Sequence, residues 1–411
     1  MSSLVRAATV AVMVSTSAWV LGADAQSEEA DPQLSASVLL EPALRTGPHH
    51  AVAETVLTPG AYHVFTITSP FGTFEAEGVS QVAVRVQEVM ALAALQDVSK
   101  AGVFARAAGE SFMKVGTGVV NAVTDPVATA KGIGGGVKRF GVNLGRRTKR
   151  AVERVTADDT SARASEPSGA GATAANAAKS LIGINGARRR WAQRVGADPY
   201  TTNPVLRDAL ERVAEVDVAG GIAAKLAVPI PPLIGTTADV GSLVWGRDPE
   251  ELRKLNEARA REMGASEDGA KAFLRNRAFT LTLQTRIVAA LRVVNVPGCG
   301  DYLASAAEAS DAREALFFVE SAEMLKAQHE TAPVAAVLTD ARALIARLPA
   351  GEAVALLPLD WVRQSAESTA ELGDLSRRAR EELGATSLRL RVSGTVTPAA
   401  ADELTRLGWR Q

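Results

Sequence analysis

Short runs of alternating apolar and polar residues near the N-terminus predict β-strands. The runs AVAETVL (51–57), YHVFTITS (62–69) and TFEAEG (73–78) are rich in β-branched or aromatic residues, and Pro and Gly turn residues separate them. We predict that they form a three-stranded meander. From Ser80 the apolar positions take helical spacing, which predicts a helix after the last strand. The polar, Pro-containing residues 26–50 are expected to be loosely ordered.

Residues 179–330 have the apolar spacing of helices, with clear start signals. Asn203 and Asp248 each precede a Pro at a first helical position, and Asp311 precedes the run AREALFFVESAEML. The segment 279–294 is apolar on most of its sides, which predicts a central, largely buried helix.

Short apolar runs return after residue 331 and predict three strands. A long helix follows them, and Asp360 is a candidate for its N-cap. The run SLRLRV (387–392) predicts another strand, and Thr397 before Pro398 opens a last helix. This order predicts a small α+β unit. The spacing leaves open whether its sheet continues the N-terminal sheet.

Composition bounds the number of domains and the class of protein. The chain has 411 residues, of which 47% are hydrophobic and 4% aromatic, and its formal net charge is -1. This length predicts two or three domains. The near-neutral charge argues against a dedicated nucleic-acid binder. We predict an α+β protein with a signal peptide (1–25), a β-meander plus helix (26–112), a Gly-rich basic amphipathic segment (113–155), a flexible linker (156–178), a helical region (179–330) and an α+β unit (331–411).

The N-terminus has the pattern of a secretory signal peptide. Arg6 precedes a short apolar stretch, and the sequence ADA at 23–25 matches a small-x-small cleavage site. We predict cleavage after Ala25 and a periplasmic or secreted mature protein; the alternative is an uncleaved anchor. Cys299 is the only cysteine, so an internal disulfide is excluded. It lies in a Gly/Pro-rich turn, where a small packed residue is favoured over a reactive thiol.

The stretch TDPVATAKGIGGGVKRFGVNLGRRTKR (124–150) has the pattern of a basic amphipathic helix. Its six glycines oppose that helix, since each costs about 1 kcal/mol relative to Ala. We therefore expect it to need an apolar surface for order, either this protein or a lipid interface. The residues on its apolar side are Ile133, Val137, Phe140 and Leu144, and the basic ones are Lys131, Lys138, Arg139, Arg146, Arg147, Lys149 and Arg150.

Nucleotide and nucleic-acid sites fit this stretch poorly. A Walker loop requires a lysine and then a hydroxyl residue directly after the last glycine, whereas Val137 follows Gly136 and Arg139 follows Lys138. The dinucleotide pattern fails because Val137 occupies its third glycine position. A single aromatic, Phe140, offers no stacking platform for bases. Two interpretations remain open. The stretch either contacts anionic lipid, cell-wall polymer or another envelope protein, or it is a packed connector with a solvated basic face.

Catalytic and metal-binding motifs are weak elsewhere. His49 and His50 beside Glu54, with His63 across a hairpin, are candidates for a metal site but lack the usual ligand spacing. The sequence SFMK (111–114) matches S-x-x-K of penicillin-interacting enzymes without their companion motifs. Gly78-Val79-Ser80 begins the G-x-S-x-G pattern of a nucleophile elbow, but Val82 occupies the position of its second glycine. The cluster RRRW at 188–191 is favoured as a solvated surface. No catalytic residue or cofactor is predicted.

Three strings give the chain a resemblance to a group of known proteins. TDPVATAKGIGGGVKRFGVNLGRR, DPYTTNPVL and EALFFVESAEML resemble uncharacterised exported proteins of Gram-negative bacteria. That resemblance implies periplasmic residence and no assigned activity. The basic segment alone is similar to membrane-contact helices of bridge-like lipid-transfer proteins.

These patterns favour a binding role over catalysis. We predict an exported envelope protein that contacts anionic membrane or cell-wall polymer through residues 126–150. The alternatives are an envelope hydrolase without an identifiable nucleophile and a purely structural partner-binding protein.

Overall fold

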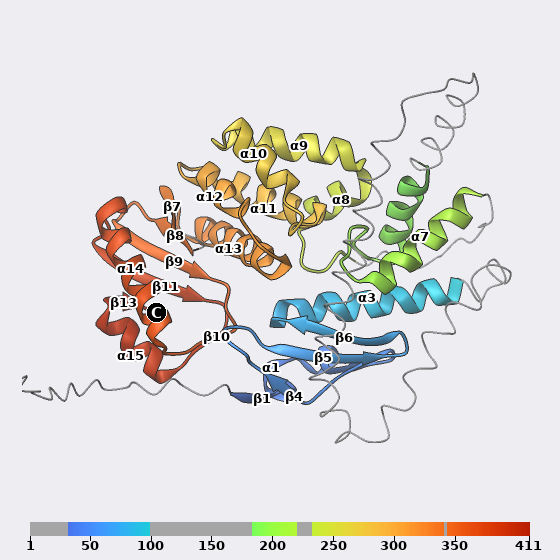
Figure 1. Cartoon of the computed structure of the whole chain (residues 1–411), viewed down its shortest axis with the longest axis horizontal. Helices are drawn as coiled ribbons and strands as arrows, with labels where there is room; N and C mark the ends of the chain where they lie inside the picture. Colours follow the sequence, from blue (N-terminus) through green and yellow to red (C-terminus); the bar gives the residue numbers. More distant parts are fainter. Residues whose placement is uncertain (1–31, 99–182, 220–231, 341–342) are drawn as a thin grey trace, which may run out of the picture.

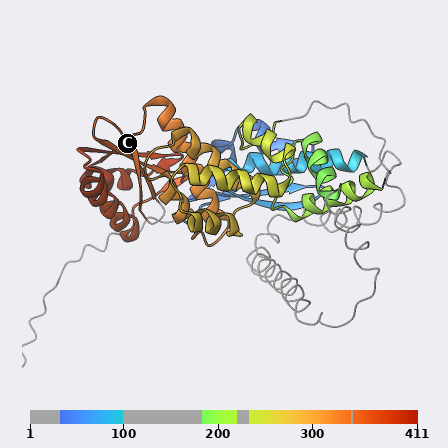
Figure 2. The same ribbon diagram turned by 90° about the horizontal axis from the view of Figure 1, so that it is seen from above.

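The computed structural model describes residues 32–98, 183–219, 232–340 and 343–411. The fold is of the α+β class, as predicted: a sheet of N-terminal strands, a helical middle and a C-terminal strand–helix region (Figure 1). The C-terminal region and helix α7 (Pro204–Val218) lie at opposite ends of the long axis in two perpendicular views (Figures 1 and 2).

The N-terminal sheet has six strands and contains the predicted meander. β5 (Val64–Ser69) pairs antiparallel with β6 (Gly72–Glu77), and on its other edge with β3 (His50–Val52) and β4 (Thr55–Leu57). The run 51–57, predicted as one strand, is thus two short strands. The buried positions of β5 alternate, as expected for a sheet with one covered face.

The prediction of loose order for residues 26–50 was wrong from residue 33 onward. Glu54 accepts hydrogen bonds from the backbone N–H and the hydroxyl of Ser37, which fixes the first helix against the sheet. These elements are too short for a periodic sequence signal, so tertiary contacts define them. They are β1 (Gln33–Ser35), α1 (Ala36–Leu39), α2 (Pro42–Arg45) and β2 (Thr46–Gly47).

Helix α3 (Val79–Val98) follows β6 as predicted and lies along the sheet (Figure 1). Its first half contributes Val82 to the core shared with the strands. Its second half packs with Leu92 and Leu95 against α7 and Trp191 of the helix at 183–194. The helix therefore joins the N-terminal sheet to the helical middle.

The helical middle is built around α11 (Leu281–Val294), the central buried helix predicted at 279–294. It packs most extensively against α13 (Ala312–Thr331). The predicted caps form, since Asn203, Asp248 and Asp311 each accept hydrogen bonds from first-turn N–H groups. Between residues 232 and 312 the other helices are α8 (Ala238–Gly246), α9 (Pro249–Glu262), α10 (Glu267–Arg275) and α12 (Cys299–Ala306).

The C-terminal strands form a separate five-stranded sheet, which answers the question left open by the sequence. β9 (Glu352–Leu357) and β11 (Ser387–Val392) are parallel neighbours, as the intervening helix requires. The sheet order is β13 (Trp409–Arg410), β11, β9, β8 (Ala343–Arg347) and β7 (Ala336–Asp340).

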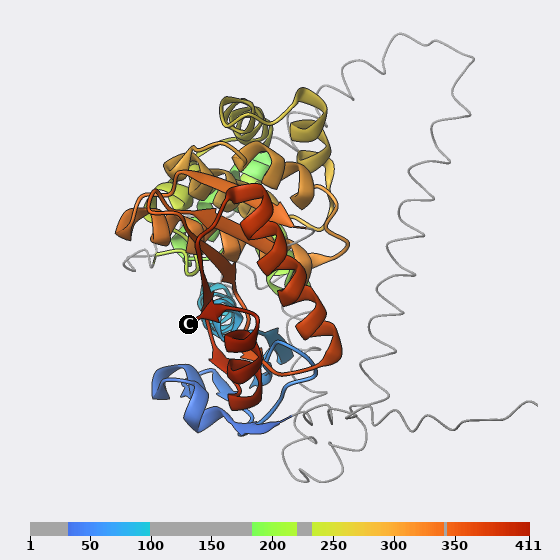
Figure 3. The same cartoon turned by 90° about the vertical axis from the view of Figure 1, so that its left-hand side faces the viewer.

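Helices cover both faces of this sheet. Val354 and Leu356 of β9 belong to the core of the helical middle. The intervening residues Ala353 and Ala355 belong to the core under α14 (Ala366–Leu383) and α15 (Pro398–Arg406). The core of the helical middle therefore continues across the boundary predicted between residues 330 and 331. Figure 3 looks onto this end, with the C-terminal helices nearest the viewer and the N-terminal strands below.

Candidate functional site

The residues predicted to contact an anionic surface belong to the basic amphipathic segment, which lies outside the described residues. Ser111 and Lys114 of the S-x-x-K match also lie there. These predictions therefore stay predictions. The contact residues concerned are Lys131, Ile133, Val137, Lys138, Arg139, Phe140, Leu144, Arg146, Arg147, Lys149 and Arg150.

The N-terminal histidines are engaged separately rather than around one point. His50 is buried, with Nε2 3.2 Å from the carbonyl oxygen of Leu44. His63 is buried too, with Nδ1 2.8 Å from the hydroxyl of Thr58. The Glu54 carboxylate accepts from α1. Within the described ranges, no three His, Cys, Asp or Glu side chains are placed to hold a metal ion.

Cys299 is a packed residue, as favoured from the sequence. It is the first residue of α12 and fully buried, and burial raises the pKa of its thiol, which makes the thiol unreactive. Gly298 precedes it with a φ of +95°. A Cβ at Gly298 would clash with the carbonyl oxygen of Val337. The turn is therefore explained by close packing of α12 against β7.

The interpretation of RRRW as a solvated surface was wrong for most of its residues. Trp191 is fully buried, and only Arg190 of the three arginines is exposed. Arg188 stacks over the Tyr200 ring, with its Cζ 6.0 Å from the ring centroid. Arg189 lies 3.7 Å from an Asp248 carboxylate oxygen. The cluster ties its helix to neighbouring elements through the long side chains that the sequence suggested were free.

Asp360 joins the N-terminal sheet to the C-terminal region, and the prediction that it caps α14 was wrong. Ser365 caps α14 instead, in a capping box with Ser368. The Asp360 carboxylate accepts hydrogen bonds from the backbone N–H of His63 at 3.0 Å and of Val79, the first residue of α3, at 3.5 Å. It therefore lies at the N-terminus of α3, where a negative charge is favourable.

Two hollows lie on either side of the Arg286 side chain, where α3, α11 and α13 meet. We call the first the threonine hollow: it has a volume of about 230 Å³ and is lined by Thr201, Thr202, Thr236, Thr280 and Thr282 together with charged residues. We call the second the arginine hollow: it has a volume of about 1080 Å³ and is lined by Arg259 and Arg292 as well as Arg286. Arg286 and Thr236 line both.

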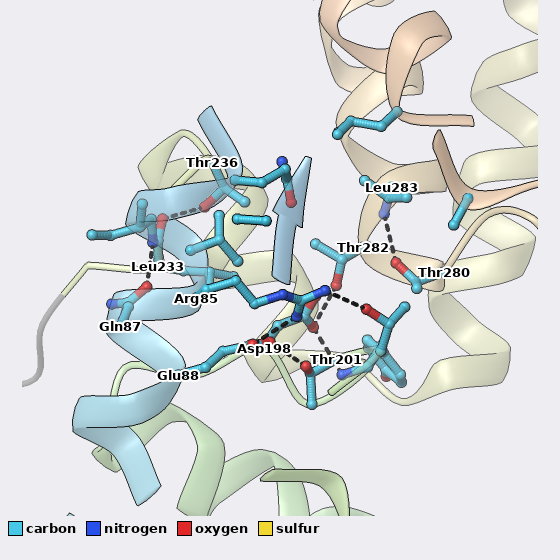
Figure 4. Close-up of a pocket in the computed structure, with 18 of the residues that line it drawn as sticks. Arg85, Gln87, Glu88, Asp198, Thr201, Leu233, Thr236, Thr280, Thr282 and Leu283 are labelled. Atoms are coloured by element: carbon cyan, nitrogen blue, oxygen red, sulfur yellow. Dashed lines mark hydrogen bonds and ion pairs between the residues drawn. The ribbon is translucent and has the colours of Figure 1, made fainter. Parts of the chain in front are cut away.

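Polar side chains of the threonine hollow bind one another around Glu88 (Figure 4). Glu88 is buried; it accepts from Arg85 at 2.7 Å, from the Asn203 amide at 3.1 Å and from the Thr201 hydroxyl. Arg85 also donates to Thr202 at 3.3 Å. Each of these groups thus has its partner within the protein, and the hollow is a matched polar junction between α3 and the loop before α7.

Asp198 is the carboxylate of the threonine hollow with a clearly raised pKa. It accepts from the Thr282 hydroxyl at 2.6 Å and from the Tyr200 backbone N–H at 2.8 Å (Figure 4). Burial raises the pKa of Asp198 to about 6, although both hydrogen bonds lower it; the nearby Glu88 carboxylate adds to the rise. The buried Tyr200 hydroxyl is an exception to the matching, since it has no partner among the described residues.

Arg286 forms the partition between the hollows. It is buried on α11 and donates two hydrogen bonds, of 2.9 and 2.8 Å, to the two oxygens of Glu323 on α13. This bidentate pair fixes the guanidinium plane. Its positive charge lowers the pKa of Asp198 on one side and of Glu320 on the other. One cation thus stabilises carboxylates of both hollows.

The arginine hollow presents cations that the protein leaves unpaired. Arg259 of α9 and Arg292 of α11 make no hydrogen bond or ion pair within the described ranges. Burial and the positive charges of Arg292 and Arg247 lower the pKa of Arg259; Glu262, one turn away, acts in the opposite direction. The protein therefore holds like charges near each other at the wall of an open hollow.

A serine and a carboxylate meet in the same hollow. Ser80, the second residue of α3, is exposed and donates to Glu320 Oε1 of α13 at 2.6 Å. Burial raises the pKa of Glu320 to about 7, and the nearby Glu323 and Asp360 carboxylates add to this rise. The Ser80 hydrogen bond and Arg286 oppose it. Glu320 therefore changes its charge near neutral pH.

Comparisons with known proteins add no identification. Searches of protein-family models, curated proteins and solved structures found no match to this chain. Among the helices in the described ranges, none combines the length and apolar character needed to cross a bilayer.

Little in the sequence indicates these hollows. The string DPYTTNPVL, one of the three that carry the resemblance, contains Asp198, Thr201 and Asn203, which build the threonine hollow. A dense run of hydrogen-bonding side chains between helices was the available signal. Ser80 and Glu320 are separated by 240 residues, so no local spacing joins them.

Proposed function

We propose that this protein binds a small anionic ligand, carrying a carboxylate or phosphate group, in the arginine hollow. The unpaired positive charges of Arg259 and Arg292 at one hollow are the observation that carries the proposal. Two like charges near each other are unfavourable alone. An anion bound between them would remove the repulsion and accept charge-assisted hydrogen bonds from both guanidinium groups.

The rest of the lining supports a ligand that also carries hydroxyl groups. Thr237, Ser242 and Asn295 offer neutral donors and acceptors, and the carboxylates of Asp239 and Glu262 can accept from hydroxyls. A volume of about 1080 Å³ accommodates more than one sugar-sized group. A saccharide bearing a carboxylate or phosphate combines these features. Such groups occur in anionic cell-wall polymers, the class of partner that the sequence predicted at another place in the chain.

The test measures binding of glucuronate and of glucose 6-phosphate by isothermal titration calorimetry at low salt. Glucose serves as the uncharged probe. We expect saturable binding of at least one anionic probe and none of glucose. The double variant Arg259→Gln/Arg292→Gln should bind at least about tenfold more weakly, which is 1.4 kcal/mol.

The control is Arg253→Gln, which removes an exposed arginine from the same helix, α9, but outside the hollow. This variant should bind like the parent protein. The proposal is wrong if neither anionic probe binds saturably, or if the double variant retains the parental affinity.

The exported location and the role of residues 126–150 remain proposals from the sequence. The basic residues of that segment favour contact with anionic head groups, each worth about 1 kcal/mol near the membrane surface. Co-sedimentation with phosphatidylglycerol vesicles tests this second proposal. The variant Lys138→Glu/Arg139→Glu/Arg146→Glu/Arg147→Glu should lose sedimentation, while Arg259→Gln/Arg292→Gln should keep it.

A further inference from the structure

The arginine hollow contains a serine in the setting of a nucleophile. Strand β6 ends at Glu77, Gly78 turns the chain with a φ of +96°, and α3 begins at Val79. Ser80 follows in the first turn of the helix. Its hydroxyl lines the hollow and is exposed, so a ligand in the hollow can reach it.

A base within hydrogen-bond distance faces this hydroxyl. Glu320 Oε1 lies 2.6 Å from Ser80 Oγ, a distance suited to direct proton transfer. With a pKa of about 7, Glu320 is a far stronger base than an ordinary carboxylate and is still ionised in half of the molecules at neutral pH. Both the distance and the pKa therefore favour proton transfer from Ser80 to Glu320.

Neighbouring groups define the environment of this pair. The Gln81 amide nitrogen lies 3.5 Å from Ser80 Oγ. The backbone N–H of Ser80 belongs to the first turn of α3, where no intrahelical carbonyl is available. Both are N–H donors beside the nucleophile, the type of group that stabilises an oxyanion. The titratable and charged groups that act on Glu320 are Arg286, Glu323 and Asp360, and Glu320 in turn raises the pKa of Tyr62.

We propose that Ser80 and Glu320 are a nucleophile and general base that hydrolyse an ester bond of a ligand held in the arginine hollow. Ser80 Oγ attacks the ester carbonyl carbon while Glu320 takes the hydroxyl proton. The tetrahedral intermediate collapses, the bond to the alcohol oxygen breaks, and Glu320 returns the proton to the leaving alcohol. Water then attacks the acyl carbon while Glu320 takes its proton; the bond to Ser80 Oγ breaks, Glu320 returns the proton to Oγ, and a carboxylic acid is released.

This activity goes beyond anion binding and is independent of it, because Ser80 and Glu320 are separate from Arg259 and Arg292. It supplies the nucleophile that the sequence alone did not identify for an envelope hydrolase. A neutral ester and an anionic one are both chemically competent substrates. The labelling assay below therefore reports on the pair even if the calorimetric test of anion binding fails.

The experiment uses a fluorophosphonate probe, whose phosphorus Ser80 Oγ would attack with loss of fluoride. Mass spectrometry of the full chain's digest locates the adduct. We expect the adduct on the Ser80 peptide, no adduct there in Ser80→Ala, and unchanged labelling in Ser305→Ala, a serine of α12 that lines neither hollow. The labelling rate should rise as pH increases through about 7, when Glu320 becomes ionised.

The variant Glu320→Gln shows whether Glu320 acts as a general base or only as a hydrogen-bond acceptor for Ser80. Glutamine keeps an oxygen that can accept from Ser80 but cannot take its proton, so labelling should slow by at least about 100-fold. Circular dichroism checks that this variant is folded. The absence of a Ser80 adduct in the parent protein, or labelling of folded Glu320→Gln at the parental rate, would overturn the proposal. The pH profile of the parent protein provides a readout that needs no variant.

Discussion

The threonine hollow and the arginine hollow share one wall but differ in how their polar groups are matched. In the threonine hollow, Glu88 accepts hydrogen bonds from Arg85, Thr201 and Asn203. In the arginine hollow, Arg259 and Arg292 have no carboxylate partner in the part of the chain that the structure describes. Matched polar groups contribute to stability, whereas unmatched ones are available to a ligand.

This difference separates a structural junction from a candidate site. A survey of charged residues alone would rate both hollows equally, because each contains arginines and acids. The hydrogen bonds decide between them. They predict that removing a matched charge of the threonine hollow lowers the free energy of unfolding, and that removing the unpaired arginines Arg259 and Arg292 weakens ligand binding.

The partition itself should show the largest effect. Replacing Arg286 with Leu leaves Glu323 without its bidentate partner and removes the cation near Asp198 and Glu320. We expect unfolding free energy to fall by about 3 kcal/mol, the low end for breaking a buried pair, because Glu323 is partly exposed. Urea denaturation followed by tryptophan fluorescence measures it.

The matched control is Arg292→Leu, which makes the same change on the same helix at an exposed position. It should change the unfolding free energy by less than about 0.5 kcal/mol. Equal urea midpoints for these two variants would show that Arg286 does not act as a structural partition.

A second comparison sets one carboxylate of the threonine hollow against one arginine of the other. Replacing Glu88 with Gln removes a charge that accepts from three side chains, and an amide group would face donors with another donor. We expect the free energy of unfolding, measured by urea denaturation, to fall by about 2 kcal/mol. Arg259→Gln should cost less than about 0.5 kcal/mol. If Arg259→Gln is the more destabilising variant, the assignment of the two hollows is reversed.

The sequence predicted the elements well where local signals exist. Asn203, Asp248, Asp311 and Thr397 all cap the helices that they were expected to begin, because capping depends on residues within one turn. The central helix α11 followed from its apolar composition. The prediction for residues 33–47 was wrong because the elements there have two to four residues and depend on contacts with the sheet.

The site depended on contacts that no local pattern contains. Ser80 and Glu320 meet only because α3 and α13 converge from distant parts of the chain. Asp360 had the composition of an N-cap for the next helix, yet it lies at the start of α3, 281 residues away from Val79. Local sequence cannot show whether Asp360 lies at the start of α14 or of α3, because that depends on how the distant segments pack.

The smallest effect concerns the pH dependence of stability. The folded pKa of Glu320, about 7, lies above the usual value of about 4.3. Between these values the folded state binds more protons, so this group destabilises the protein as pH rises and has its full effect above pH 7. Glu320→Gln removes the penalty. We expect it to raise the unfolding free energy at pH 8 by about 1.5 kcal/mol, less than the full shift implies, because the side chain is partly solvated.

At pH values below about 4 the advantage of Glu320→Gln should disappear, because Glu320 is then neutral in both folded and unfolded states. The control Glu262→Gln removes an exposed carboxylate of the same hollow and should change the unfolding free energy by less than about 0.5 kcal/mol at pH 8. Urea denaturation of the three proteins at both pH values measures this difference. A Glu320→Gln variant less stable than the parent at pH 8 would mean that Glu320 is held there as a stabilising anion. In that case the arginine hollow would match its charges as the threonine hollow does.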